Sequence, residues 1–307
     1  MKISTTLFFN NASNQLGNVQ GELSKTQIQL STGLQIVKPS DSPDKAALVT
    51  RLESELARQA SYQDTLKSVN TRLQSQETAL KNTSDVLTRM KELAIQAAND
   101  TLSVSDRNTI ALEISSLRDQ ALSLANTQDA NGNYLFSGSR VGLPAFGADA
   151  KGKIIYQGDQ SRMKVAVGDS RRMNLNMPGS DAFVKVVRDD GKGGQIGTGF
   201  FNAIDDLVTS VKSSDYNNIQ RGIKELSFLQ QGVSDASAQV GADMNVVDMQ
   251  NSVLDEIVLR LKTTRSDVQD LDYTSAVTKM NKDQLALEAA QSSFAKISQL
   301  TLFKYMN

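Results

Sequence analysis

The chain has 307 residues, with 33 basic and 34 acidic side chains and a formal charge of −1. This balance gives no overall field that would favour nucleic acid or an anionic membrane surface. Cysteine, histidine and tryptophan are all absent. The sequence therefore excludes disulfides, metal sites built from thiolate or imidazole, and catalysis by histidine.

The N-terminal segment, residues 1–15, carries a single Lys and a broken apolar cluster followed by Asn-rich sequence. That cluster is too short for the apolar region of a signal peptide, and no small-residue cleavage site follows it. No stretch approaches 18 consecutive apolar residues, so we expect no membrane-spanning helix. If the protein leaves the cell, we expect it to do so without the ordinary cleaved signal.

The first predicted helix carries one thin apolar stripe in polar surroundings. Its positions alternate three and four residues apart and are Leu16, Val19, Leu23, Thr26 and Leu30. A helix with so narrow a stripe buries little by itself and needs a partner. Gly33 suits the position after the last helical residue, where a positive φ is common.

The connector after Gly33 is predicted to be extended and then to open a long helix. Pro39 and Pro43 disfavour helical geometry in the residue before each of them. Asp41 or Ser42 can cap a new helix that has Pro43 at its first position. Helical spacing then continues to about Asn99, which corresponds to a length of about 85 Å.

The long predicted helix supplies the centre of the helical core. We expect this core to contain Leu66, Val69, Leu73 and Leu80. Three polar residues, Gln59, Gln76 and Thr83, fall in the same stripe, where they would weaken packing but fix the register against a partner. Ser105 or Asp106 is predicted to cap a further helix, carrying apolar residues to Leu124, that folds back on the long one.

The middle of the chain changes character. The run 131–138 indicates a turn followed by a short apolar strand. Residues 139–197 contain short runs typical of strands, separated by glycine-containing turns. The strand-like runs are Lys153 to Tyr156, Met163 to Val167, Met173 to Asn176 and Phe183 to Val187. We interpret this region as a small β-rich domain that caps the far end of the helical part.

Helical periodicity resumes from Phe200 to Val211 and again from Tyr216 to Val233, and a last segment runs from about Val246 to Phe303. The final portion repeats apolar residues at heptad spacing, and neither Gly nor Pro occurs after Gly241. We predict a mainly α fold, an elongated bundle of long antiparallel helices formed by the N- and C-terminal segments, with the β-rich domain inserted between them.

Three regions follow from this pattern. Residues 39–138 and 198–271 are predicted to form a helical core rod, and residues 139–197 the β-rich insert. Residues 1–38 and 272–307 are predicted to be coiled-coil assembly helices, disordered in the monomer until a partner supplies the missing apolar surface. The predicted assembly interface consists of Leu16, Val19, Leu23, Leu30, Val277, Met280, Leu287 and Phe294.

No motif indicates catalysis, a cofactor or a metal. The run from Asp129 to Asn133 begins like a calcium-binding loop, but Tyr134 and Arg140 stand where that loop needs Gly and Glu. The glycines between 191 and 199 match no phosphate-binding pattern and favour a flexible connection. Paired carboxylates at Asp189/Asp190 and Asp205/Asp206 are explained by solvated charge. We therefore expect a protein that is not an enzyme.

The connector resembles the signature of the bacterial flagellin superfamily. The matching residues are Leu30-Ser31-Thr32-Gly33, Ile36, Pro39-Ser40-Asp41 and Pro43. The Pro-Ser-Asp-x-Pro form, the run 131–138 and Tyr156-Gln157-Gly158-Asp159 are similar to the hook-associated members of that superfamily. Leu34 and Gln35 depart from the family, which commonly has a basic residue there, and Ser42 stands where a second acidic residue is frequent.

The resemblance implies a structural adaptor that joins the flagellar hook to the filament. It implies contacts with the first hook-associated protein, with flagellin, with further copies of the chain in a ring and with an export chaperone, but not with nucleic acid or membrane. It also implies an extracellular location reached through the flagellar export apparatus. Two alternatives stay open, a flagellin-like filament subunit and a coiled-coil adhesin or signalling rod.

Overall fold

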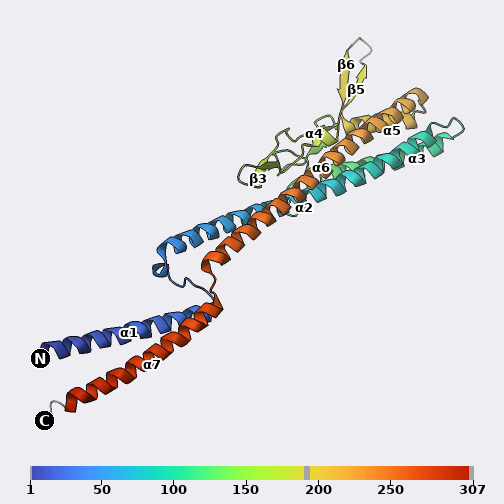
Figure 1. Cartoon of the computed structure of the whole chain (residues 1–307). Coiled ribbons are helices and arrows are strands. Elements are labelled where there is room, and N and C mark those ends of the chain that lie inside the picture. Colours follow the sequence, from blue (N-terminus) through green and yellow to red (C-terminus); the bar gives the residue numbers. More distant parts are fainter. Residues whose placement is uncertain (1, 190–193, 304–307) are drawn as a thin grey trace. The chain divides into compact units, whose positions relative to one another are not determined.

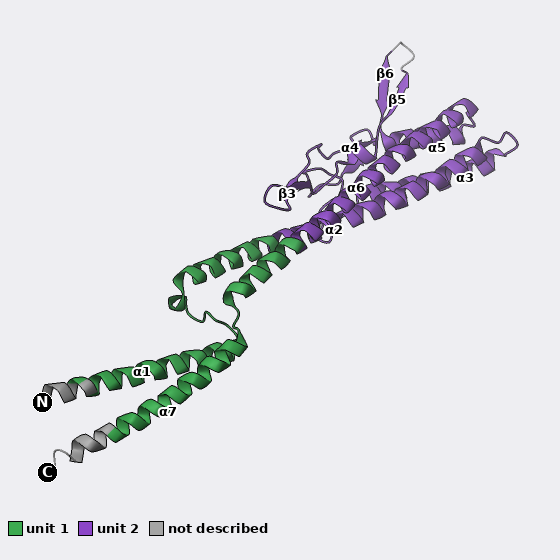
Figure 2. Cartoon of the chain, viewed as in Figure 1, with its two compact units in different colours: residues 1–59, 256–307 green, residues 60–255 purple. Residues whose placement is uncertain are grey.

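The computed structural model describes residues 2–189 and 194–303, and only the backbone of residues 2–6, 8 and 297–303 (Figure 1). The chain forms two compact units (Figure 2). The first, here called the terminal unit, contains residues 1–59 and 256–307, and the second, the central unit, contains residues 60–255. The predicted boundaries of the rod and the assembly helices stay a prediction.

The helices confirm the mainly α prediction. The first helix is α1 (Lys2–Thr32), followed by Gly33 with a φ of +72° and a short 3-10 turn at Pro39–Asp41. Helix α2 (Pro43–Ala97) begins at the predicted proline. After the middle region come α5 (Phe200–Lys212), α6 (Tyr216–Gln269) and α7 (Tyr273–Phe303).

The predicted C-terminal helix differs from the structure at one point. Helix α6 runs unbroken from Tyr216, and the chain then leaves helical geometry at 270–272 before α7 begins. The prediction of one continuous segment from Val246 to Phe303 was therefore wrong. Neither Gly nor Pro marks this break, because it depends on a contact with the α1 connector that is described below.

Helix α3 (Val104–Ala125) starts earlier than predicted. Its N-cap is Ser103, whose Oγ accepts a hydrogen bond from the backbone N–H of Asp106. Asp106 in turn accepts from Ser103, which completes a capping box. Such a box satisfies two otherwise unpaired donors, whereas a cap at Ser105 or Asp106 would lose this reciprocal pair.

The β-rich insert consists of three separate two-stranded antiparallel sheets within the described residues. They pair β1 (Phe146–Ala148) with β2 (Ile154–Tyr156), β3 (Lys164–Ala166) with β4 (Arg172–Asn174), and β5 (Val186–Asp189) with β6 (Gln195–Thr198). A short helix, α4 (Gly179–Ala182), lies between β4 and β5. Such short hairpins need the helices beside them for stability.

Two local predictions in this region were wrong. Leu135 and Phe136 are fully buried but form no strand, and the segment has only isolated bridges at Tyr134 and Ser137. Conversely, Gln195–Thr198 forms strand β6 and not a flexible connection. The remaining predicted glycine-rich residues, 190–193, lie outside the described residues.

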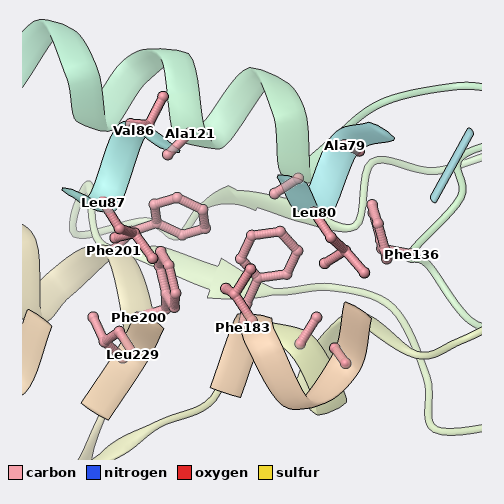
Figure 3. Packing of buried hydrophobic residues seen from close by; sticks show 14 of the residues in the cluster. Ala79, Leu80, Val86, Leu87, Ala121, Phe136, Phe183, Phe200, Phe201 and Leu229 are labelled. Carbon is pink, nitrogen blue, oxygen red and sulfur yellow. The ribbon is translucent and has the colours of Figure 1, made fainter. Parts of the chain in front are cut away.

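The insert lies along the side of the helices and does not cap their end. Figure 3 shows Phe183 and Phe201 packed beside Leu80 and Leu87 of α2 in one continuous core. The four predicted core residues are confirmed as buried, with Leu66, Val69 and Leu80 at 0% exposure and Leu73 at 3%. Burial of these side chains gives the central unit its stability.

One buried ion pair attaches the segment after α3 to α2. Arg72 Nη1 lies 2.6 Å from Asp129 Oδ2, and Arg72 Nη2 donates to the Tyr134 carbonyl at 3.1 Å. Asp129 also accepts from the backbone N–H groups of Asn131 and Asn133. Although burial acts to raise it, these hydrogen bonds and the Arg72 charge together lower the pKa of Asp129. The calcium-loop-like run is therefore a hydrogen-bonded turn.

Among the residues that the structure describes, no helix combines the length and the hydropathy of a membrane-spanning segment. Over the same residues, no group of three or more Asp and Glu side chains converges in a way that would hold a metal ion. The predicted solvated carboxylates Asp205 and Asp206 accept hydrogen bonds from Arg118 and Arg188 respectively.

Candidate assembly surface

Helices α1 and α7 of the terminal unit pack along each other in opposite directions. Near the chain ends, the ring centroids of Phe9 and Phe294 are 4.5 Å apart. Further along, Lys279 Nζ lies 2.8 Å from Glu22 Oε2. The predicted N-terminal stripe therefore faces the C-terminal stripe of the same chain.

Most predicted assembly residues lie on this α1–α7 seam. Those that are half-buried along it are Leu16, Val19, Leu23, Leu30, Met280, Leu287 and Phe294. Val277 does not share their position, because its side chain is 42% exposed while the adjacent Ala276 is buried. On α7 the predicted residues Met280, Leu287 and Phe294 lie on the seam, and the buried residue near Val277 is Ala276. The role of these residues in an assembly interface stays a prediction.

The seam also contains two polar groups, Thr26, which the predicted stripe included, and Asp283, which it did not. Thr26 has no exposed surface, and its hydroxyl donates to the Glu22 carbonyl at 3.0 Å. Asp283 Oδ2 is buried without a hydrogen-bond partner among the described residues. A carboxylate in an apolar stripe weakens a helix pair unless another group meets it.

The terminal unit buries little apolar surface overall. Among its described residues, the buried hydrophobic side chains are Ile36, Val49 and Ala276, whereas the connected core cluster lies wholly in the central unit. Large apolar side chains on its outer faces remain exposed, including Leu7 at 61% and Leu285 at 69%. A helix pair with so little buried surface is marginal by itself in water.

The breaks that end α1 and α6 are hydrogen-bonded to each other. Leu34 and Asp270 form an antiparallel bridge. The Leu271 N–H donates to the Gly33 carbonyl at 2.9 Å, and the Gln35 N–H donates to the Gln269 carbonyl at 2.8 Å. We call this arrangement the terminal joint, and it explains why the chain leaves helical geometry at 270–272 without Gly or Pro.

Gly33 is required at the terminal joint for its backbone conformation. Its φ is +72°, and a Cβ placed there would lie 2.9 Å from the hydroxyl oxygen of Tyr273. A β-branched residue at positive φ is strained by about 1 to 2 kcal/mol. The tyrosine side chain is flexible, so we attribute most of the cost of a larger residue to the backbone.

We expect Gly33→Val to loosen the α1–α7 pair. Hydrogen exchange of backbone amides in α1 and α7 should accelerate about tenfold or more, as a strain of this size implies. Gly17→Val is the matched control, because Gly17 lies within α1 with no atom near its would-be Cβ. Equal exchange in the two variants would show that the joint does not hold the helices.

Three carboxylates in the terminal unit are stabilised in their charged form. The side chain of Lys279 lowers the pKa of Glu22. The backbone N–H of Lys38 and then the Lys25 ammonium lower the pKa of Asp41, and the hydroxyl and N–H of Ser275 lower that of Asp272. Asp272 caps α7, since the Thr274 N–H donates to its Oδ1 at 3.0 Å.

We expect the terminal unit to lose stability in acid. Each of these carboxylates binds its proton less tightly when folded, so its contribution is complete above the ordinary pKa, 4.5 for Glu and 3.8 for Asp. It is lost as the pH falls through the lower folded value. Amide exchange in α1 and α7, corrected for intrinsic rates, should be constant from about pH 7 to pH 5 and accelerate below about pH 4.5.

The substitution Asp41→Asn should flatten this dependence, while Asp64→Asn, a change in the central unit, should leave it as it is. A loss of protection centred near neutral pH would contradict the assignment, because the chain contains no histidine.

Sequence reasoning missed the joint and the seam residues Ala276 and Asp283. Asp272 was a detectable cap signal, because Asp is one of the residues preferred at the N-cap of a helix. No local pattern pairs Leu34 with Asp270, since residues so far apart in the chain meet only in the folded structure.

Comparisons with known proteins show which family shares this sequence and fold. The model for the bacterial flagellin N-terminal helical region matches residues 3–140, and that for the C-terminal helical region matches residues 223–306. The chain is 27% identical to flagellar hook-associated protein 3 of Escherichia coli, over 99% of each protein. It is 24% identical to flagellin B of Vibrio anguillarum, over 97% of each. A putative flagellar hook-associated protein from Vibrio parahaemolyticus superimposes with a TM-score of 0.67 at 25% identity, covering 75% of this chain and all of that one.

Proposed function

Because this chain belongs to the flagellin superfamily, in the group of flagellar hook-associated protein 3, we propose that it is the structural adaptor between hook and filament. The observation that carries this proposal is the sparsely buried α1–α7 pair. A stripe that stays half-exposed is suited to completion by neighbouring subunits, as is the buried Asp283 Oδ2, which has no hydrogen-bond partner among the described residues. The central unit, in contrast, has its own core.

The proposed partners follow from that position. We infer that α1 and α7 pack against the first hook-associated protein on one side and flagellin on the other, with further copies of the chain beside them in a ring. Before assembly, an export chaperone would cover the exposed apolar side chains. Export through the flagellar apparatus without a cleaved signal would place the protein outside the cell.

The proposed role requires no catalysis. The family is one of structural flagellar proteins. The most buried ion pairs of the central unit make structural contacts, as Arg72 does with Asp129 and Arg188 with Glu225. We therefore propose a non-enzymatic protein whose α1 and α7 act as assembly helices.

Limited proteolysis of the dilute monomer tests this proposal. We expect about thirty residues to be lost from each end while a fragment from about 40 to 270 survives, because marginal terminal helices open readily. Mass spectrometry locates the cuts, and a mixture with the first hook-associated protein should protect both ends. Termini that resist cleavage in the monomer would remove the main support for assembly by α1 and α7.

A seeded-growth experiment separates the adaptor from a filament subunit. Purified chain added to hook ends that carry the first hook-associated protein should form a layer of limited height and then allow flagellin to add. Long filaments grown from this chain alone would instead favour the flagellin-like alternative. The match to flagellar hook-associated protein 3 of Escherichia coli over 99% of both chains supports the adaptor.

A further inference from the structure

A groove lies beside the β5–β6 hairpin, in a part of the central unit that has no role in the proposed assembly surface. It has a volume of about 610 Å³ and lies between β5 and the N-terminal part of α6. Figure 1 shows the hairpin standing apart from the other strands. Ligand sites in proteins commonly measure about 300 to 1,000 Å³. The groove is therefore large enough for a short piece of another molecule.

One side of the groove is the edge of strand β5. All four residues of β5, Val186 to Asp189, line the groove, and no residue of β6 does. Because consecutive residues of a strand point to opposite faces, a groove lined by all of them follows the edge of the strand. Strand β6 pairs with the other edge.

The groove edge of β5 is free to pair. Within residues 2–189 and 194–303, no second strand pairs with it. Over the same residues, Val186, Val187 and Arg188 form no backbone hydrogen bond outside the hairpin. The N–H and C=O groups along such an edge are a template for a further strand.

The opposite side of the groove is a face of α6 that carries Arg221, Lys224, Glu225 and Phe228. The Phe228 side chain is 52% exposed, and that of Val187, which also lines the groove, is 60% exposed. A large apolar side chain of a partner that covered both would remove apolar surface from water. The groove therefore offers backbone pairing and apolar contact together.

The exposed charge at the groove is mainly positive. Lys224 is exposed and forms no ion pair with another residue that the structure describes, and Arg221 is 44% exposed. Glu225 is nearly buried, and both of its carboxylate oxygens accept from Arg188, at 2.7 Å. Among the described lining residues, Asp189 is the one exposed carboxylate. A partner with a carboxylate beside an apolar residue complements this arrangement.

The hairpin is fixed in place beside α6. Arg188 makes a bidentate contact with Glu225 of α6 and also contacts Asp206 of α5. Just before β5, Val184 lies so close to Gly232 of α6 that a Cβ on this glycine would be 2.7 Å from Val184 Cγ2. These contacts form the groove before a partner arrives, which lowers the cost of binding.

We propose that this groove binds a short extended segment of another protein that combines an apolar residue with a carboxylate. The segment adds a strand to the free edge of β5, its apolar side chain lies at Val187 and Phe228, and its carboxylate is directed to Lys224. This proposal concerns the central unit alone and does not depend on the adaptor function.

Calorimetric titration of the intact chain with an octapeptide that alternates valine and glutamate, blocked at both ends, tests the groove. We expect one site with a Kd below about 200 µM, a modest affinity suited to a strand this short. The same peptide with lysine in place of glutamate should bind at least tenfold more weakly. A peptide with two adjacent prolines at its centre cannot pair along a strand and should not bind.

Substitutions in the groove have matched controls elsewhere in the central unit. Lys224→Glu should weaken binding at least fivefold, while Lys67→Glu, the same change on an exposed face of α2, should have no effect. Phe228→Ala should weaken binding about fivefold, whereas Leu112→Ala, which truncates a side chain that is 65% exposed on α3, should not. Unchanged melting temperatures of all four variants show that the central unit is folded.

Four results would overturn the proposal. Absence of binding to the unaltered chain at about 1 mM peptide would reject the site. Equal binding by Lys224→Glu and Lys67→Glu would place the peptide elsewhere, and binding of the proline peptide would show that no strand is added. A dimer of the chain that Lys224→Glu dissociates, measured by analytical ultracentrifugation, would assign the groove to a second copy of this chain.

Discussion

Replacing Leu23 or Leu287 with Asp is expected to abolish incorporation of the protein at the hook–filament junction. Both leucines are half-buried in the α1–α7 seam, on opposing helices. A carboxylate in that position must be desolvated, which costs roughly 2 kcal/mol or more in a helix pair that is already marginal. Motility and recovery of the protein in isolated flagella measure incorporation, and we expect both to fall at least tenfold.

Two controls separate assembly from folding. Thermal unfolding of the central unit should be unchanged in both variants, because its core is separate from the seam. Gln20→Asp introduces the same charge on an exposed position of α1 and should be incorporated normally. If the Leu23 and Leu287 variants assembled as well as Gln20→Asp, the seam would have no role at the junction.

Replacing Arg72 with Leu is expected to destabilise the central unit by about 3 to 5 kcal/mol, because it leaves the Asp129 carboxylate without its counter-charge. The Arg72 side chain is only 7% exposed and that of Asp129 16%. The substitution also removes the donor to the Tyr134 carbonyl, which holds the segment before the buried Leu135 and Phe136. Chemical denaturation measures the free energy of unfolding.

The double substitution Arg72→Leu with Asp129→Leu should recover part of that loss, since no unpaired charge then remains. Lys67→Leu, on an exposed face of α2, is the control and should change stability by less than about 0.5 kcal/mol. Additive losses in the double variant would show that the two side chains do not act as a pair.

Local patterns in the sequence were enough to predict most of the long helices and the stripe along α1. Leu16, Val19, Leu23 and Leu30 recur at a helical period, and such a period puts side chains on one face whatever the rest of the chain does. Pro43 and Gly33 fixed helix ends for similarly local reasons, because their backbone preferences do not depend on distant residues. The motifs around Gly33 and Pro39 also led to the correct family.

How distant segments meet depends on the tertiary fold. The break after Gln269 exists because Leu34 and Asp270 pair, and hydrogen bonds between residues so far apart leave no periodic trace in either segment. The insert lies along the helices because its residue Phe183 shares a core with Leu80 of α2 and Phe201 of α5. Ala276 is buried in the seam and Val277 is exposed. A heptad repeat defines a stripe only to within one residue, and packing against the facing helix decides which side chain is buried.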